Sequence, residues 1–272
     1  MTFLKGTKAG NLLTEIRDNA PLVWNISNFV SMDIAANLLL SIGASPAMAH
    51  AIEEADSFSN LCKAINGALT INIGTFDMHW QNCALKVAAE AKSKKIPWVL
   101  DPVGAGASEF RNRNAQELLS LKPTVLRANG SEIISMSGLK NSGKGVDSTS
   151  SSNEALDAAI AIAKTNEIIV AVTGKVDYVT DGFKVYGIHG GNEMITKITA
   201  TGCALTCLVG AGLTSKQDHL SSTAKMLGIY SVASDKAYKF AKGPASFRTE
   251  LIDVMYNLTP EEVEKNIKIE LI

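Results

Sequence analysis

The chain has 272 residues, 46% of them hydrophobic, which is enough for one large domain with its own core and argues against disorder. Its 26 basic and 27 acidic residues balance and no long basic run occurs, so nucleic acid is a poor candidate partner. We also expect no membrane attachment and a cytoplasmic location, because no segment has the apolar length of a signal peptide or a membrane span.

The first part of the chain predicts two helices with a short strand between them. An amphipathic pattern ends before Pro21, and a second apolar face lies between a possible cap at Ser31 and a stop at Gly43. The predicted elements are a helix over 4–19, a strand over 22–26, a helix between Ser31 and Gly43, and a loop or short strand over 44–50. An acidic patch over 53–56 follows.

From residue 68 to residue 173, strongly apolar segments alternate with helical patterns. The predicted strands cover 68–74, 98–102, 124–128 and 168–173. The predicted helices cover 77–95, 108–121 and 154–166. A further short helix is predicted to begin at Ser131, which is a possible cap. Apolar strands that alternate with helices indicate a mostly parallel sheet covered on both faces.

The spacing of apolar residues along the sequence changes after residue 173. Residues 177–189 alternate around Asp181-Gly182, which predicts a hairpin that adds antiparallel strands at one edge. The rest is predicted to be helical: a helix beginning near Thr201, then 220–242, 244–256, and a last helix from Thr259. We therefore predict a single α/β domain over residues 1–272, with a mostly parallel central sheet, helices on both faces and an antiparallel edge hairpin.

The segment 197–207 is the most informative one, because small and hydroxyl residues lead up to Gly202 and an apolar segment follows. We interpret it as a strand-to-helix corner whose first-turn N–H groups and helix dipole can hold an anion. Gly202 leaves room for the anion, and Cys203 lies on the first turn. A tight turn before a core helix, with cysteines used for packing, explains the segment equally well.

Polar residues also follow four successive predicted strands. They are Gly74, Asp101, Arg127 to Asn129, and Thr173-Gly174. Since ligands bind beyond the carboxyl ends of parallel strands, these residues are expected to meet at one rim of the sheet.

Each of these residues has a structural explanation beside the functional one. Asp101 can cap a loop and Glu132 can accept first-turn N–H bonds, but together they supply the oxygen ligands that magnesium prefers with phosphate and water. Arg127 can pair with a surface acid, or bind a phosphate through charge-assisted hydrogen bonds. Thr173 can be a core hydroxyl group.

Other motifs are too incomplete to indicate a function. Gly138–Gly145 nearly matches a Walker A loop, but Gly145 replaces the magnesium-binding hydroxyl residue. Gly104-Ala105-Gly106 lacks the third glycine of a dinucleotide fingerprint, so an NAD-dependent dehydrogenase is a distant alternative. The histidines are scattered and the cysteines show no CxxC spacing, which argues against a catalytic triad, a zinc site and disulfides.

Several blocks together resemble the hydroxyethylthiazole kinases, which are thiamin-salvage enzymes of the ribokinase-like fold. The blocks are Ala44–Met48, Asn72–Thr75, Leu100–Ala107, Arg127–Ile133, Val172–Gly174, Asp177–Gly182 and Thr201–Leu205. The similarity extends in order from about residue 20 to the Gly243–Phe247 segment. It implies transfer of the γ-phosphoryl group of ATP to the primary alcohol of 4-methyl-5-(2-hydroxyethyl)thiazole, with Mg²⁺.

The resemblance also implies roles for matching residues. Arg127 and Thr173 are expected to contact ATP, and Asp101 and Glu132 to serve the metal. The N–H groups of Thr201–Cys203 are expected to hold the transferring phosphoryl group.

On the substrate side, Cys203 is expected beside the substrate hydroxyl. The thiazole pocket is expected to be lined by Met48, Ala200, Asn25 and Asn28. The family is trimeric with pockets between subunits, so a homotrimer is expected, in which Gly74 reaches a neighbour's site.

The chain departs from the family at Ala200, where a glycine is usual in Gly-Thr-Gly-Cys. The added methyl group narrows the pocket or requires a compatible backbone angle. Most ribokinase-like enzymes resemble one another in having an aspartate base at the position of Cys203. Because phosphoryl transfer depends mainly on positioning and charge neutralisation, we hypothesise that Cys203 orients or deprotonates the alcohol.

Two alternatives stay open at this level. The first is another ribokinase-like kinase of a small alcohol, for example hydroxymethylpyrimidine. The second is an inactive nucleotide-binding module, which the presence of Asp101, Glu132 and Gly202 disfavours.

Overall fold

The computed structural model describes residues 2–138 and 148–272, which form eleven α-helices and a nine-stranded sheet. The near-Walker motif at Gly138–Gly145 lies, apart from Gly138, outside the described residues. Within the described part of the chain, no helix is both long enough and apolar enough to cross a membrane.

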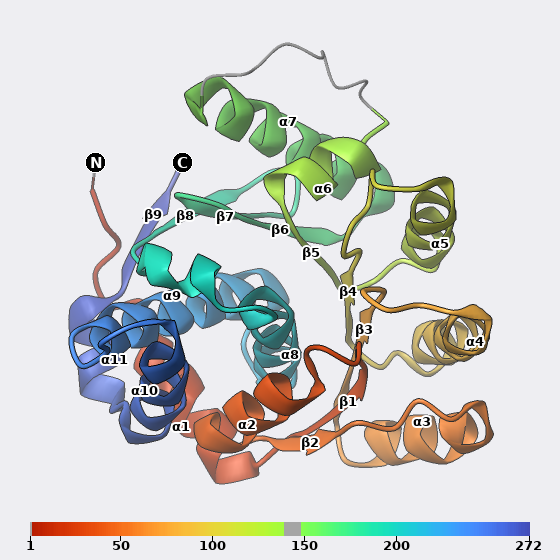
Figure 1. Cartoon of the computed structure of the whole chain (residues 1–272), viewed down its shortest axis with the longest axis horizontal. Helices are drawn as coiled ribbons and strands as arrows, with labels where there is room; N and C mark the ends of the chain where they lie inside the picture. Colours follow the sequence, from red (N-terminus) through yellow and green to blue (C-terminus); the bar gives the residue numbers. More distant parts are fainter. Residues whose placement is uncertain (1, 139–147) are drawn as a thin grey trace.

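The strand order of the sheet is β2-β1-β3-β4-β5-β6-β7-β8-β9 (Figure 1). The strands from β2 to β6 are parallel, and β7, β8 and β9 each lie antiparallel to the preceding strand in this order. The bounds are β1 Leu22–Ile26, β2 Ser45–Ala47, β3 Ala68–Asn72, β4 Trp98–Asp101, β5 Val125–Asn129, β6 Ile169–Thr173, β7 Asp177–Thr180, β8 Val185–His189 and β9 Lys268–Leu271. The predicted mostly parallel sheet and its antiparallel hairpin are confirmed.

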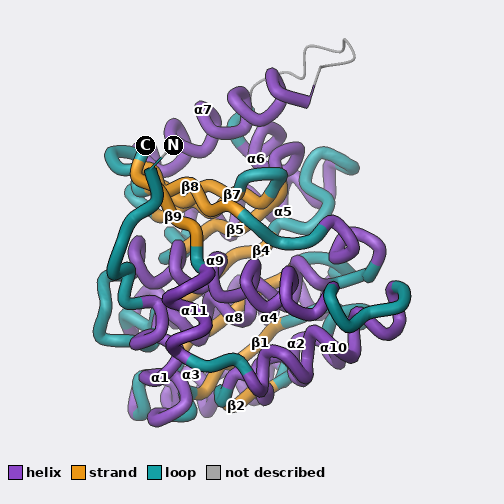
Figure 2. The backbone as a smooth tube through the Cα atoms, turned by 90° about the vertical axis from the view of Figure 1, so that its left-hand side faces the viewer, coloured by secondary structure: helices purple, strands orange, loops and turns teal. Residues whose placement is uncertain are grey.

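Helices cover both faces of this sheet. One face carries α3 (Ala55–Ala64), α4 (Met78–Lys94), α5 (Glu109–Ser120), α6 (Gly130–Met136) and α7 (Ser148–Asn166). The other carries α2 (Met32–Ile42), α8 (Thr201–Leu213) and α9 (His219–Tyr238). Over these lies an outer layer of α1 (Ala9–Asn19), α10 (Pro244–Asn257) and α11 (Pro260–Asn266), on the side that Figure 2 shows. Two 3₁₀ turns complete the described elements, η1 (Ile52–Glu54) and η2 (Glu193–Lys197).

The strands divide their side chains between two cores. Val23 and Val99 point into the core under α2, α8 and α9, while their neighbours Trp24 and Leu100 point into the core under α3 to α7. This follows from the two-residue period of a strand. It also explains why the strands are apolar throughout, as the sequence analysis assumed.

Helix α8 packs very closely on the sheet. A Cβ atom on Gly210 would lie 2.7 Å from Cγ2 of Thr70 on β3 and 3.2 Å from Cγ1 of Val23 on β1. Glycine is therefore required for this approach. The close packing brings the start of α8 to the strand ends.

Several predicted boundaries and caps are wrong. The first helix begins at Ala9 rather than near residue 4, and helix α3 (Ala55–Ala64), which no pattern predicted, begins within the acidic patch and extends beyond it. Ser31 is the residue before α2, but its hydroxyl bonds to Ser27 and to the Asn28 carbonyl and makes no cap.

Two further corrections concern the later elements. Ser131 does not cap α6, because the Asn129 side chain accepts the N–H of Glu132 and forms a capping box with it. The C-terminal residues 268–271, predicted to be helical, form the edge strand β9, so the hairpin is not itself the edge.

Candidate functional site

The turn from Ala200 into α8 lies against the carboxyl ends of the central strands. A Cβ atom on Gly202 would be 3.0 Å from both Nη1 and Nη2 of Arg127, so no side chain fits unless Arg127 moves. The first N–H groups of α8 have no partner within the helix and lie at the positive end of its dipole. An anion held there would meet both these donors and a buried cation.

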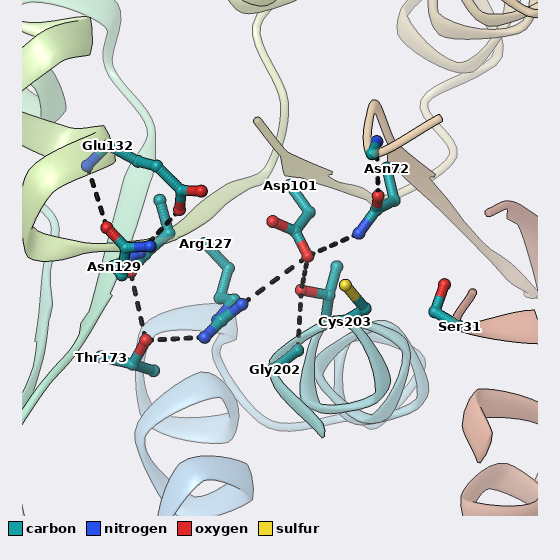
Figure 3. A network of polar contacts seen from close by, with 12 residues as sticks. Ser31, Asn72, Asp101, Arg127, Asn129, Glu132, Thr173, Gly202 and Cys203 are labelled. Carbon is teal, nitrogen blue, oxygen red and sulfur yellow. Dashed lines mark hydrogen bonds and ion pairs between the residues drawn. The ribbon is translucent and has the colours of Figure 1, made fainter. Parts of the chain in front are cut away.

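Arg127 is fixed at this rim by two side chains (Figure 3). Its Nη2 donates to Oγ1 of Thr173 at 2.6 Å, and its Nη1 lies 3.6 Å from Oδ2 of Asp101. The residue is 7% exposed, and its Nε has no acceptor among the described residues. A buried guanidinium with incomplete pairing is suited to a further anionic ligand.

Asp101 is fully buried, and its two carboxylate oxygens differ in their surroundings. Oδ2 accepts hydrogen bonds from Nδ2 of Asn72 and Oγ1 of Thr206, both at 2.8 Å, whereas Oδ1 has no partner in the described part of the chain. Burial raises the pKa of Asp101 to about 6, against the lowering effect of Arg127, and Glu132 raises it further. The free Oδ1 is therefore a strong acceptor without a donor.

Glu132 accepts backbone N–H groups, which is the structural role expected of it as the alternative to binding magnesium. Its Oε2 accepts the N–H of Asn129 at 3.0 Å, and its Oε1 accepts the N–H of Gly104 at 2.8 Å. The carboxylate thus joins the start of α6 to the loop after β4. Figure 3 shows its contact with Asn129.

The two acids fit a magnesium ion as outer contacts rather than as a complete cage. No group of three or more His, Cys, Asp or Glu residues in the described chain could hold a metal by itself. Asp101 offers its free Oδ1, and Glu132 is near enough to influence it electrostatically. Since magnesium usually keeps several waters and takes substrate phosphates as ligands, this donor set is compatible with it.

A cavity of about 700 Å³ opens beside the turn. Its lining brings together the residues assigned to ATP and the start of α8, namely Arg127, Thr173, Thr201 and Gly202. Thr201 does not offer its hydroxyl, which donates to the carbonyls of Ile195 and Ile198. The backbone of the turn therefore provides the donors.

Cys203 is partly exposed on the first turn of α8, and its sulfur lies 3.6 Å from Nδ2 of Asn28. Burial, with a smaller effect of the nearby Asp101, raises the pKa of the thiol to about 11. The neutral thiol is the resting form at pH 7. Cys203 is thus better suited to orienting an alcohol than to deprotonating it.

Neither Cys203 nor the other candidates for the substrate side line this cavity. Met48 is partly buried against the core under α2 and α8. Asn25 is fully buried, with its amide engaged by the Val23 carbonyl and by the Thr70 hydroxyl. Ala200 is the residue before α8 and has a φ of 65°, in the left-handed region.

Asn28 and Gly74 lie next to each other. A Cβ atom on Gly74 would be 2.6 Å from Nδ2 of Asn28 and 3.0 Å from Oδ1 of Asn72. Gly74 is thus in contact with two buried amides of its own chain. Its backbone also accepts a bond from Arg111, at 2.7 Å.

Four further residues organise this rim, and none of them was predicted to do so from the sequence. Asn72 and Thr206 bind Asp101, Arg111 bonds the loops after β3 and β4 together, and the Tyr230 hydroxyl donates to the Thr201 carbonyl. Asn72 had a detectable signal, because it is a polar residue that ends an apolar strand. Thr206, Arg111 and Tyr230 lie within helices and gave none.

Asp177 also lines the cavity. Its Oδ1 accepts the N–H of Gly174 at 2.9 Å. Burial raises its pKa to about 6, which this hydrogen bond and Arg127 partly oppose.

The chain matches the model of the hydroxyethylthiazole kinase family over residues 13–261. It is 45% identical to a hydroxyethylthiazole kinase from Rhizobium rhizogenes and 43% identical to one from Pyrococcus furiosus, over 97% of this chain and 97% and 98% of those proteins. A relative of the same name from Zea mays is 44% identical, over 98% of this chain and 94% of that one.

Solved structures agree with this similarity. The structure of hydroxyethylthiazole kinase protein from Pyrococcus horikoshii OT3 superimposes with a TM-score of 0.88 at 37% identity, covering 97% of this chain and 98% of that one. Pyridoxal kinase from Staphylococcus aureus in complex with AMP-PCP and pyridoxal superimposes with a TM-score of 0.62 at 14% identity, covering 93% and 98%. The second likeness concerns the fold alone, which is the ribokinase-like fold predicted from the sequence.

Proposed function

The chain belongs to the hydroxyethylthiazole kinase family, and from this premise we propose that it transfers the γ-phosphoryl group of ATP to the primary alcohol of 4-methyl-5-(2-hydroxyethyl)thiazole. We further propose that residues 1–272 form one kinase domain and that the enzyme acts in the cytoplasm.

The contact between Gly202 and Arg127 is the observation that carries the proposal. Arg127 and Gly202 line the same cavity, and the fully buried carboxylate of Asp101, whose Oδ1 has no partner among the described residues, lies beside Arg127. Charge that develops on a transferring phosphoryl group would be stabilised by donors already in position.

In this proposal Arg127 and Thr173 bind the phosphates of ATP. The N–H groups of Thr201, Gly202 and Cys203 surround the transferring group. Their contribution is mainly positioning and charge neutralisation, because the transition state of phosphoryl transfer is loose.

Asp101 and Glu132 would face a magnesium ion that is itself held by the nucleotide phosphates. When bound, the ion neutralises phosphate charge. Asp101 would meet it through Oδ1 and Glu132 through water, since the oxygens of Glu132 already accept two backbone N–H groups.

On the acceptor side, we propose that Cys203 holds the alcohol in line with the phosphoryl group. Met48, Ala200, Asn25, Asn28 and Gly74 would shape the thiazole pocket. The 3.6 Å contact of the Cys203 sulfur with Asn28 and the raised pKa of the thiol support an orienting role for Cys203. The assembly we propose is a homotrimer, in which Gly74 lies near a neighbouring subunit's pocket.

A coupled assay tests the function directly. Purified protein is given ATP, Mg²⁺ and the thiazole alcohol, and ADP release is compared with that for hydroxymethylpyrimidine at equal concentration. We expect the thiazole alcohol to be preferred. If the pyrimidine alcohol is preferred, the proposed substrate is wrong. If folded protein binds ATP but shows no turnover, the result supports an inactive nucleotide-binding module.

A further inference from the structure

A chain of buried amides connects Asp101 to Cys203. Nδ2 of Asn72 donates to Oδ2 of Asp101 at 2.8 Å, and Oδ1 of Asn72 accepts from Nδ2 of Asn28 at 2.7 Å. The same Nδ2 of Asn28 lies 3.6 Å from the Cys203 sulfur. Both asparagines are almost fully buried, so these contacts are shielded from water.

The orientation of both amides follows from the contacts at the two ends. An ionised carboxylate only accepts hydrogen bonds, so Asn72 must turn its NH₂ group towards Asp101 and its oxygen towards Asn28. Asn28 must then turn its own NH₂ group towards Asn72. The oxygen of Asn28 is fixed independently, because it accepts the N–H groups of Val30 and Ser31, each at 3.0 Å.

Gly74 packs against the side-chain amides of Asn72 and Asn28. Its N–H donates to Oδ1 of Asn72 at 2.9 Å, and its missing side chain is the space that the two amides occupy. With every amide atom engaged, Asn28 has one orientation, in which an N–H group is directed at the sulfur of Cys203.

We propose that Asn72 is a positioning residue that links the phosphate end of the site to the acceptor end. It holds Oδ2 of Asp101, which leaves Oδ1 free, and it acts on the Cys203 sulfur both through its own amide and through the N–H group of Asn28. The sulfur's own proton is thereby left to point away from Asn28. The effect of Asn72 on turnover rests on the proposed function. Its effect on the reactivity of the Cys203 thiol does not.

The substitution Asn72→Leu tests the link, because leucine has a similar volume and no polar atoms. Turnover of the thiazole alcohol is expected to fall roughly 10- to 100-fold, as for other residues that orient a group in the site, while the KM for ATP stays near its wild-type value. Asn72 has no contact with Arg127 or Thr173 among the described hydrogen bonds, which is why ATP binding is spared.

The second measurement is the rate of alkylation of Cys203 by iodoacetamide at one fixed pH, followed by mass spectrometry without substrate. Cys62, Cys83 and Cys207 are buried, so Cys203 is the cysteine that reacts first. An N–H directed at sulfur favours the reactive thiolate, so Asn72→Leu is expected to slow the reaction about threefold or more.

Thr206→Val provides the matched control. It removes another donor from Oδ2 of Asp101 but leaves the amides between Asp101 and Cys203 intact. It is expected to slow turnover without changing alkylation. Asn114→Leu replaces a buried asparagine on α5 outside the site and is expected to change neither.

Unchanged alkylation in folded Asn72→Leu protein, or an equal change in Thr206→Val, would overturn the proposed link. If the leucine variant does not fold, Asn72→Ala removes the acceptor for Asn28 and carries the same alkylation test. Failure of the wild-type protein to phosphorylate the thiazole alcohol would instead contradict the proposed function, and the alkylation result would still decide the role of Asn72.

Discussion

Cys203 is the residue whose chemistry differs most from what a catalytic base needs. Its thiol has a pKa of about 11, so near pH 7 it is protonated and almost no thiolate is present to take the alcohol proton. A phosphoryl transfer that depends mainly on positioning tolerates this, because the donors at the start of α8 and Arg127 supply the electrostatic stabilisation.

Cys203→Ser therefore tests how much the thiol contributes. General-base assistance is worth about 10²- to 10⁴-fold, so we expect turnover to fall by no more than this. ATP affinity, measured by calorimetry, should stay near the wild-type value, because the ATP contacts are assigned to Arg127 and Thr173. Loss of ATP binding in a folded variant would contradict the role given to Cys203.

Ala200 has a backbone conformation that costs energy for any residue with a Cβ atom. Its φ of 65° lies in the left-handed region, where glycine is favoured by about 1 kcal/mol. Ala200→Gly should therefore raise the free energy of unfolding by about this amount, measured as a higher urea midpoint at unchanged slope. If the methyl group narrows the thiazole pocket, the KM for the alcohol also falls.

Ala20 offers a matched control for this substitution. It follows α1, is exposed, and has a φ of 42°. Ala20→Gly should stabilise the protein in the same way and leave the KM for the alcohol unchanged. A higher KM in Ala200→Gly would mean that the methyl group makes a favourable contact with the substrate.

Asp177 gives a stability effect with a definite pH dependence. Its pKa is about 6 in the folded protein against the ordinary value of 3.8, so the folded state binds more protons between these values. Its contribution to stability is therefore present at low pH and is lost as pH rises towards 6.

Asp177→Asn removes this titration and keeps an oxygen that can accept the Gly174 N–H. Relative to wild type, the variant should gain stability from pH 4 to pH 6 and keep a constant advantage above that, amounting to less than about 3 kcal/mol. Urea unfolding at several pH values measures the difference. Parallel stability curves for the two proteins would rule the effect out.

The site was predicted from sequence where its residues follow apolar strands. Asp101, Arg127 and Thr173 end strands β4, β5 and β6 or lie near their ends, and parallel pairing brings such positions to one rim. Thr206 and Tyr230 face the site from helices, where one sequence contains no signal for orientation towards a distant carboxylate. Their roles required the packing of α8 and α9.

At the scale of elements, segments were missed where their order depends on packing rather than on a local sequence pattern. Helix α3 fully buries only the small residues Ala55, Ser59 and Cys62, while its aromatic residue Phe58 is partly buried and stacks on Trp24 of β1. Strand β9 has a single buried residue, Ile269, and gains its order from pairing with β8. Both are stabilised by tertiary contacts rather than by local sequence.

Helix α6 illustrates how a cap fixes a functional side chain. Asn129 lines the cavity and also caps α6, while Glu132 completes the capping box and bonds Gly104. Asn129→Ala should lower the free energy of unfolding by about 1 kcal/mol, as expected for the loss of an N-cap, measured by urea unfolding.

Ser131→Ala distinguishes this cap from the one predicted by sequence. The Ser131 hydroxyl only donates to the Asn129 side chain, at 2.7 Å, so its removal should cost less than Asn129→Ala. The reverse order of stabilities would restore Ser131 as the cap.

At the scale of the whole molecule, the proposed homotrimer has a surface that it should cover. Phe29 is 68% exposed and Met78 63% exposed, and both lie at the rim near Trp80, whose ring contacts Phe29. Phe29 directly follows Asn28, so an assembly that covers this surface would also enclose the acceptor end of the site.

The mass in solution tests this assembly. Light scattering should give three times the chain mass of 28.9 kDa, and Phe29→Asp should lower the mass and the turnover together, because a charge is costly at an apolar interface. Tyr256→Asp changes another exposed aromatic residue, at the end of α10, and should lower neither. A fully active monomer at micromolar concentration would contradict the trimer, and it would mean that one chain encloses its substrate without a neighbour.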